Sequence, residues 1–417
     1  MIDLRALRDD PAIRLAIERK RVSPELIDEV LALDRGHRDL QQAVEQMRAR
    51  QKAASKAVSG ADSDDRAGLV AQASELKQEL QAAEVGLSEI TARLNELAFQ
   101  IPNPADASVP DGGEDDGEVF RIVGDTPPPP PMDHGQFGSA LGFIETDHAV
   151  GASGARFASL MREAVFIEFA LVQWALQQLR DEGFVAVVPP TLVREEAMVE
   201  AGFFPTDRNQ VYAVEADELF LVGTSEVLLA SLHRGERLPP SQLPARYSGV
   251  SSCFRREAGT YGKDTTGIFR VHQFDKVEMF SFVEPSESDA EHERLLSIQE
   301  KLIGLLGLPY RVVNIAAGDL GAAAAKKYDI EVWLPSEGRY RELTSCSNYR
   351  DFSARRLDTR VEGAKGQANQ FVHTLNGTAC AVGRTLVFCL EHYQRDGEFI
   401  VPEVLVPFTG FESVTVR

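Results

Sequence analysis

Residues 253–280 read CFRREAGTYGKDTTGIFRVHQFDKVEMF, and the fold of the chain can be inferred outward from this stretch. It opens with FRRE at 254–257 and closes with RVHQF at 270–274, with Gly262, Lys263 and Gly267 in the polar segment between them. Two apolar-rich runs on either side of a polar, glycine-containing loop are typical of a β-hairpin. The stretch therefore predicts two antiparallel strands with a long loop at their tip.

The spacing F-R-x-E, loop, R-x-x-x-F resembles motif 2 of the class II aminoacyl-tRNA synthetases, and the whole stretch is similar to that of the seryl-tRNA synthetase family. An exposed hairpin with an Arg–Glu ion pair would explain an isolated F-R-x-E, but not a match over the full stretch. The resemblance implies that Arg255 places a planar cation on the charge that develops when a carboxylate attacks ATP. It implies that Phe274 stacks on adenine, that Glu257 accepts from the adenine amino group, and that Arg256 and Val271 belong to the ATP site.

The composition is that of a soluble globular chain, with 417 residues, 43% apolar and 26% charged. This length allows roughly two to four domains. The formal net charge of -20 argues against nucleic-acid binding by the surface as a whole, but residues 102–137 alone carry eight acids against one base. The distribution of charge therefore matters more than its sum.

The cysteines and the N-terminus indicate a cytoplasmic protein without zinc. Cys253, Cys346, Cys380 and Cys389 form no C-x-x-C pair and no zinc signature with histidine, as expected for free thiols in a reducing compartment. The N-terminus has no signal-peptide pattern, and no apolar run reaches the roughly 18 residues of a membrane-spanning helix.

Two long runs near the N-terminus alternate apolar residues in a 4-3 pattern. The first runs from Leu26 to Val58 after a Ser23-Pro24-Glu25 helix start, and the second from Leu69 to Ile101, with a polar turn at 59–68 between them. This predicts an antiparallel coiled-coil arm over about 26–101, within an N-terminal domain of residues 1–101. Two helices of a bundle would show a wider apolar stripe, so a free-standing arm is favoured.

One face of the predicted arm is basic, because residues 35–56 hold six bases and two acids. Such a face suits a phosphate backbone, although a solvated helix face is the ordinary alternative. The resemblance implies that the arm grips the long variable arm of a tRNA. The predicted tRNA-binding residues are Arg35, Arg38, Arg48, Arg50, Lys52, Lys56 and Lys263.

The acidic, proline-rich stretch 102–140 is predicted to be a linker, followed by a catalytic domain at 141–417. In that domain a long helix is expected over 154–182, a second helix over 289–307, and strands at about 310–315 and 329–334. The pattern Gly183-Phe184-x-x-Val187-x-x-Pro190 resembles motif 1. That resemblance implies a dimer interface and hence a homodimer.

The resemblance implies a serine site assembled from three separate segments. In Thr224-Ser225-Glu226 the family holds the serine amino group, and a carboxylate beside a hydroxyl suits an ammonium. The same residues could instead begin a helix, and the two roles can coexist. Glu278 is expected in the same pocket, together with Asn376 and Thr378 at a position where the family usually reads N-G-S-G.

Two further segments resemble ATP-binding motifs. Glu342-Leu343-Thr344-Ser345 resembles the family's E-x-x-S strand, in which Glu342 and Ser345 would hold a Mg²⁺ bridging the ATP phosphates. A strand glutamate in an ion pair is the alternative. Residues 375–385 resemble motif 3, which is expected as a helix ending in Arg384 that covers adenine and reaches the γ-phosphate.

Together these features predict an α+β fold, with an antiparallel mixed sheet flanked by helices and a coiled-coil arm at the N-terminus. The function that the resemblance implies is activation of L-serine with ATP and transfer of serine to tRNA(Ser), and also to tRNA(Sec). Arg255 and Arg384 are the predicted catalytic residues, and ATP and Mg²⁺ the predicted cofactors. A ligase that loads a carrier protein and a non-catalytic binding protein are the alternatives; the first lacks such an arm, and the second would have lost residues such as Arg255 and Glu342.

Overall fold

The computed structural model describes residues 2–259 and 267–416. The chain divides into two compact units, Met1–Pro102 and Asn103–Arg417, which are described separately. Among the described residues no helix is long and apolar enough to cross a membrane.

The described part of the first unit, residues 2–102, contains four helices, α1 (Leu4–Asp9), α2 (Pro11–Glu18), α3 (Pro24–Gly60) and α4 (Ser63–Ala98). The start of α3 is the predicted one, since Ser23 Oγ accepts from the backbone N–H of Leu26 and Pro24 follows the cap. At the base of the arm, α1 and α2 pack with α3 and α4 around Ile17, Ile27 and Leu94.

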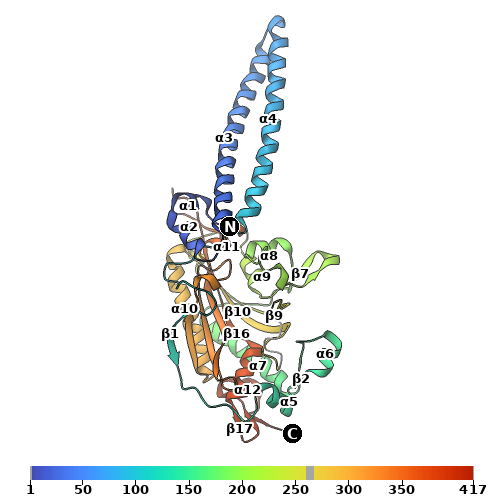
Figure 1. The fold of residues 1–417 in the computed structure, drawn as a ribbon, viewed down its shortest axis with the longest axis vertical. Coiled ribbons are helices and arrows are strands. Elements are labelled where there is room, and N and C mark those ends of the chain that lie inside the picture. Colours follow the sequence, from blue (N-terminus) through green and yellow to red (C-terminus); the bar gives the residue numbers. More distant parts are fainter. Residues whose placement is uncertain (1, 260–266, 417) are drawn as a thin grey trace. The chain divides into compact units, whose positions relative to one another are not determined.

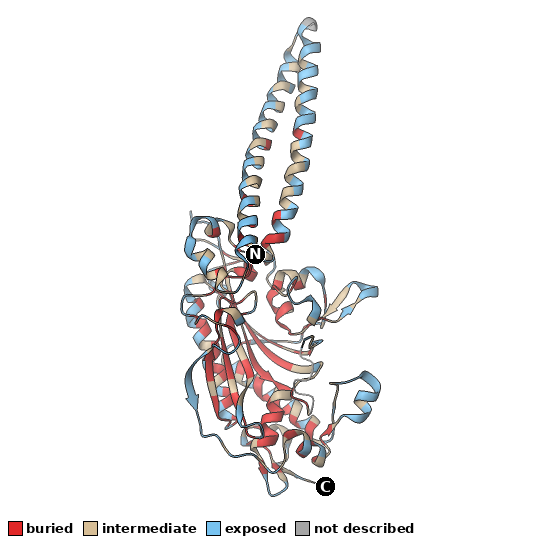
Figure 2. Ribbon diagram, viewed as in Figure 1, coloured by how far each residue is buried: buried red, intermediate tan, exposed pale blue. Residues whose placement is uncertain are grey.

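Helices α3 and α4 form the predicted coiled-coil pair (Figure 1). The predicted seam positions, such as Val44 and Leu80, are shielded along both helices, whereas the other faces are exposed (Figure 2). Gly36 permits close approach, because a Cβ there would lie 2.9 Å from Cδ1 of Ile90. The turn is shorter than predicted, since α3 runs to Gly60 and α4 begins at Ser63. Residues 59, 60 and 65–68 are exposed, so helix propagation rather than burial extends α3 and α4 here, because each residue added to an existing helix gains one hydrogen bond.

The second unit is built on an eight-stranded sheet, which confirms the predicted fold class. The strand order is β1-β11-β12-β13-β16-β10-β9-β4, and of these neighbours only β4 and β9 are parallel among the described strands. The bounds are β1 Glu118–Val123, β11 Tyr310–Asn314, β12 Lys326–Leu334, β13 Arg339–Asn348, β16 His373–Ala381, β10 Gln273–Val283, β9 Ala245–Phe254 and β4 Val185–Val187.

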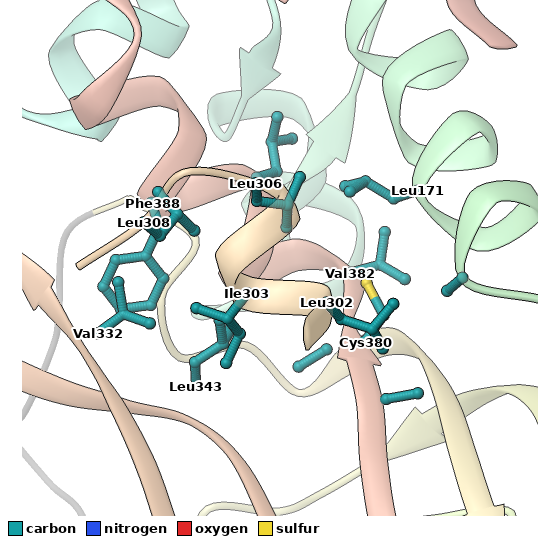
Figure 3. Packing of buried hydrophobic residues seen from close by; sticks show 14 of the residues in the cluster. Leu171, Leu302, Ile303, Leu306, Leu308, Val332, Leu343, Cys380, Val382 and Phe388 are labelled. Carbon is teal, nitrogen blue, oxygen red and sulfur yellow. The ribbon is translucent and has the colours of Figure 1, made fainter. Parts of the chain in front are cut away.

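Helices α7 (Glu163–Asp181), α10 (Ser288–Leu305) and α12 (Val382–His392) supply the core that covers the sheet. In Figure 3, Leu171 of α7, Leu302 of α10 and Phe388 of α12 gather with Val332 of β12 and Leu343 of β13. Helix α10 and strand β11 lie within two residues of the predicted ranges, whereas β12 begins three residues before the predicted strand. The central strands are the most deeply buried part of this unit (Figure 2).

Shorter elements surround the sheet. They are β2 Ile144–Glu145, α5 His134–Leu141, α6 Asp147–Ser153, β3 Ser159–Leu160, β5 Leu192–Arg194, α8 Glu195–Ala201, β6 Ala213–Val214, β7 Leu219–Leu221, α9 Glu226–Ser231, β8 Arg237–Leu238, α11 Phe352–Leu357, β14 Arg360–Val361, β15 Gln370–Phe371, β17 Gln394–Arg395, β18 Glu398–Ile400, α13 Val406–Thr409 and β19 Ser413–Thr415.

The helix predicted over 154–182 is wrong at its start, because α7 begins at Glu163. The apolar spacing continues upstream, but residues 159–160 form a short strand and Arg162 has a φ of 58°. An α-helix cannot include a residue in that left-handed conformation.

The stretch 102–140 differs from the predicted free linker. Strand β1 pairs with β11, and residues 134–141 form α5. Ala105 and Val109 are buried, and the side chain of Asn103 donates to the carbonyl of Tyr349 at 2.8 Å. The composition of this stretch is dominated by its eight acids, so it does not reveal the few apolar residues that face inward.

Candidate active site

The predicted hairpin is confirmed, since β9 and β10 pair antiparallel from Phe254↔Gln273 to Ala245↔Phe282. Its strands form one wall of a cavity of about 560 Å³, together with β13, β16 and the starts of α9 and α12. Lys263, predicted to bind tRNA, lies outside the described residues.

The structure brings most of the predicted serine and ATP residues to this cavity. Those that line it are Thr224, Glu226, Arg255, Glu257, Val271, Phe274, Glu278, Glu342, Leu343, Thr344, Ser345, Asn376, Thr378 and Arg384. Two predicted residues do not line it. Ser225 is buried behind the wall, with its Oγ 3.5 Å from the carbonyl of Gly249, and the side chain of Arg256 is exposed.

One end of the cavity is a buried acidic pocket. The Nδ2 of Asn376 donates to Oε2 of Glu226 at 2.8 Å and to Oε1 of Glu278 at 3.2 Å, while Thr378 Oγ1 donates to Oε2 of Glu278 at 3.1 Å. Burial, reinforced by the charge of Glu278, raises the pKa of Glu226 to about 7. The pocket thus combines two carboxylates that can receive a cation with an amide and a hydroxyl that orient them.

The glutamates reach this pocket from different elements. Glu226 is the first residue of α9, and its backbone N–H donates to Thr224 Oγ1 at 3.3 Å, so the helix start predicted at Thr224-Ser225 is present. Glu278 projects from β10, and Asn376 and Thr378 from β16, which pairs with β10. Residues two apart on a strand share a face, which aligns Asn376 with Thr378.

The other end of the cavity presents cations and aromatic rings. The guanidinium of Arg255 lies 5.3 Å from the ring of Phe274, and its Nε donates to the carbonyl of Gly223 at 3.3 Å. Glu257 forms an ion pair with Arg270, and Arg384 lies 4.9 Å from the ring of Phe269. This end can hold an aromatic ring and an anion side by side.

Glu342 lies between the cations of this end. Arg384 Nη1 donates to its backbone carbonyl at 3.0 Å and to its Oε2 at 3.4 Å. Although burial opposes ionisation, Lys327, Arg384 and Arg255 lower the pKa of Glu342 to about 2. Its carboxylate is therefore charged at neutral pH and can serve as a metal ligand.

The prediction for motif 3 was wrong in one respect. Arg384 lies in the first turn of α12 rather than at a helix end. The preceding residues form β16, since the run from His373 to Ala381 pairs with β10 and β13.

Sequence reasoning missed several residues of the cavity, among them Lys276, Lys327 and Tyr349. Lys276 lies two positions before Glu278 on the same strand, so strand alternation could have identified it. Tyr349 hydrogen bonds the side chain of Glu226 from beyond the end of β13, and nothing in the local sequence indicates that contact.

Two family models match this chain. Residues 1–105 match the Seryl-tRNA synthetase N-terminal domain, and residues 210–393 match the tRNA synthetase class II core domain (G, H, P, S and T). The chain is 47% identical over 415 residues to the serine–tRNA ligase of Acidothermus cellulolyticus, covering 98% of each chain. The chain belongs to the seryl-tRNA synthetase family. A serine–tRNA ligase of Mycobacterium tuberculosis is also 47% identical, covering 99% of each chain.

Solved structures agree with the family. The seryl-tRNA synthetase from Pyrococcus horikoshii complexed with ATP superimposes with a TM-score of 0.93 at 34% identity, covering all of both chains. A prolyl-tRNA synthetase from Giardia lamblia shares the fold at a TM-score of 0.57 and 15% identity over 65% of this chain. As a seryl-tRNA synthetase, the chain binds ATP and joins serine to tRNA. These matches are explained without the two alternatives, a ligase that loads a carrier protein and a non-catalytic binding protein.

Proposed function

We propose that the cavity on the β9–β10 hairpin binds L-serine at its acidic end and ATP at its cationic end, and forms seryl-adenylate between them. The observation that carries this proposal is the buried pair of Glu226 and Glu278 in the same cavity as the exposed guanidinium of Arg255. Serine is a zwitterion, so its site needs an anionic group for the ammonium and a cationic group for the carboxylate. The serine carboxylate must also lie close to the ATP phosphates, because it attacks the α-phosphate.

Serine binding divides among three kinds of group. Glu226, at the start of α9 beside Thr224, receives the ammonium, and Arg255 holds the carboxylate. Glu278 accepts a hydrogen bond from the serine hydroxyl, with Thr378 and Asn376 orienting the glutamate. Alanine is rejected because it leaves the buried Glu278 carboxylate without the hydrogen bond that the serine hydroxyl would donate.

ATP binding uses the rings and cations of the other end. Adenine stacks on Phe274, with Arg384 on its other face and Glu257 at its amino group; Val271, Leu343 and Thr344 line the site. A serine carboxylate oxygen attacks the α-phosphate, the bond from that phosphorus to the bridging oxygen breaks, and pyrophosphate leaves. Arg255 stabilises the developing negative charge, and positioning does the rest without a general base.

The proposed metal ion is Mg²⁺ that arrives with ATP. Among the described residues no group of three or more acids, histidines or cysteines could hold a metal ion. Glu342, which is ionised, and the hydroxyl of Ser345 supply the oxygen ligands that a hard cation prefers, and they would hold Mg²⁺ together with the ATP phosphates. When bound, Mg²⁺ neutralises the phosphates and orients them for in-line attack.

The α3–α4 arm is proposed to bind tRNA(Ser), and tRNA(Sec), through its exposed bases. Arg35, Arg50, Lys52 and Lys56 are exposed, whereas Arg38 and Arg48 form ion pairs with Asp34 and Glu84 at 3.1 and 2.8 Å. Exchange of the exposed Arg48–Glu84 pair for a phosphate contact costs little. Buried Asp34 also accepts from Arg8, so it keeps a cationic partner when Arg38 turns to a phosphate.

A homodimer in the cytoplasm is proposed from the apolar residues around α7 and β4. Phe166 and Phe169 of α7 are 60% and 67% exposed, and Val188 after β4 is 84% exposed. Large apolar side chains exposed on a surface mark an interface; Val188 lies within the predicted motif 1, and Phe166 and Phe169 lie on the helix that precedes it.

The experiment that tests the proposed site is serine-dependent ATP–pyrophosphate exchange in a Glu278→Gln variant. The variant should lose about 100-fold or more in kcat/KM for serine, because the hydroxyl loses its charged acceptor. Glu300→Gln is the matched control, since Glu300 is a shielded carboxylate that pairs with Arg121 away from the cavity. Equal exchange by both variants would refute the serine site.

A further inference from the structure

Lys276 is a buried lysine in the acidic pocket for which the proposed reaction has no role. It lies on β10 and is 6% exposed. Its Nζ lies 2.6 Å from Oε2 of Glu278 and 2.8 Å from Oγ1 of Thr224. A buried ammonium is tolerated only when it is paired, so this contact with two proposed serine-binding residues calls for an explanation.

The first consequence of Lys276 concerns charge. Glu226 and Glu278 contribute two formal negative charges, and Lys276 contributes one positive charge. When both glutamates are ionised, the pocket has a net charge of minus one, which the ammonium of one amino acid balances. Without the lysine, two like charges would share a buried space, and such pairs disfavour ionisation of one member.

The second consequence concerns the orientation of Glu278. Its Oε2 accepts from Lys276 and from Thr378 Oγ1, and its Oε1 accepts from Asn376 Nδ2. Three donors from two strands fix the carboxylate plane, with one acceptor direction on Oε1 left for a ligand, since each carboxylate oxygen has about two lone pairs. An acceptor held in one direction discriminates a hydroxyl from a methyl group better than a rotating one does.

The third consequence concerns Thr224. Its Oγ1 accepts from Lys276 Nζ at 2.8 Å and from the backbone N–H of Glu226 at 3.3 Å. Both lone pairs of the hydroxyl are then occupied, which leaves its proton to donate into the cavity. The serine ammonium is accordingly received by Glu226.

We propose that Lys276 is a positioning residue that determines serine specificity, because its ammonium locks Glu278 as the acceptor for the serine hydroxyl. The inference rests on the proposed serine site. It predicts that Lys276 acts on serine recognition through Glu278 and not on ATP binding, since its two polar partners both belong to the acidic end.

The test compares serine and alanine in pyrophosphate exchange by Lys276→Met and Lys276→Arg. Lys276→Met should raise KM for serine and lower the serine-to-alanine ratio of kcat/KM by at least about tenfold, with KM for ATP within about twofold of the parent. Lys276→Arg keeps the cation and should restore part of the ratio. Lys326→Met is the control, because Lys326 lies over the ring of Tyr328 and does not line the cavity.

A folded Lys276→Met enzyme with an unchanged serine-to-alanine ratio would overturn the inference, as would a loss confined to KM for ATP. If Lys276→Met does not fold, the double variant Lys276→Met/Glu278→Gln removes both buried charges together. Because the lysine acts through Glu278, this variant should have the same ratio as Glu278→Gln alone, and a further tenfold drop would overturn the inference.

The same data separate this inference from the serine site on which it rests. If Glu278→Gln leaves the serine-to-alanine ratio intact, the serine site itself is wrong. If Glu278→Gln strongly lowers the serine-to-alanine ratio of kcat/KM and Lys276→Met leaves it unchanged, the serine site stands and only the proposed role of Lys276 is wrong.

Discussion

Serine binding should strengthen as pH rises through 7, because Glu226 must be ionised to receive the ammonium. Burial is the main cause that raises the pKa of Glu226 to about 7, and the neighbouring charge of Glu278 adds to it. Lys276, Arg255 and the hydrogen bond from Tyr349 lower that pKa only in part. About half of the Glu226 carboxyl groups are therefore protonated at neutral pH before serine binds.

The magnitude follows from this pKa. With a pKa of about 7, roughly a tenth of the sites hold ionised Glu226 at about pH 6, and roughly three quarters do at about pH 7.5. Since the apparent dissociation constant is divided by the competent fraction, affinity for serine should rise roughly eightfold over this range. Because Glu226 is a carboxyl group with a raised pKa and must be ionised to bind the ammonium, serine affinity is highest above that pKa and falls below it.

Calorimetric titration of L-serine without ATP measures this directly. In two buffers that differ in ionisation enthalpy, binding at about pH 7 should release about half a proton per site. The control is Glu226→Gln, which should bind serine weakly and with no pH dependence. A dissociation constant that stays level from about pH 6 to about pH 7.5, with no proton release, would refute the assignment of the ammonium to Glu226.

Three other predictions concern the two half-reactions. Arg255→Ala should reduce pyrophosphate exchange by about 100- to 1,000-fold without loss of fold, as for removal of one transition-state donor, and near-normal exchange would contradict its catalytic role. Thr378→Ser should lower the serine-over-threonine ratio in exchange because it removes a methyl group from the pocket wall; an unchanged ratio would show that this methyl does not limit the pocket. Substitution of four arm bases by Glu should leave pyrophosphate exchange intact but reduce tRNA charging by orders of magnitude and weaken the salt dependence of tRNA binding; the four are Arg48, Arg50, Lys52 and Lys56. Full charging by this variant would show that these bases do not bind tRNA.

Features with a regular period or a long contiguous motif could be predicted from the sequence. The α3–α4 arm follows from heptads, because a seam that repeats along the helix must be buried by a partner. The β9–β10 hairpin follows from one contiguous stretch. The motif at 375–385 assigns Asn376 and Thr378 to the site, although it predicts a helix where β16 forms, and the pairing of β16 with β10 brings them into the cavity. Glu278, Asn376 and Thr378 meet for this reason.

Features that depend on a single backbone conformation or on distant packing could not be predicted. The start of α7 is set by the left-handed conformation of Arg162, which apolar periodicity does not reveal. Strand β1 forms because β11 offers an edge for pairing, a property of residues far away in the sequence. Tyr349 reaches Glu226 across the fold in the same way.

The most direct test of the proposed site is a crystal structure of the enzyme with a non-hydrolysable analogue of seryl-adenylate. We expect the serine hydroxyl within hydrogen-bond distance of Glu278, the ammonium against Glu226, and adenine stacked on Phe274. An analogue bound with its serine end away from Glu226 and Glu278, or with adenine elsewhere than on Phe274, would contradict it.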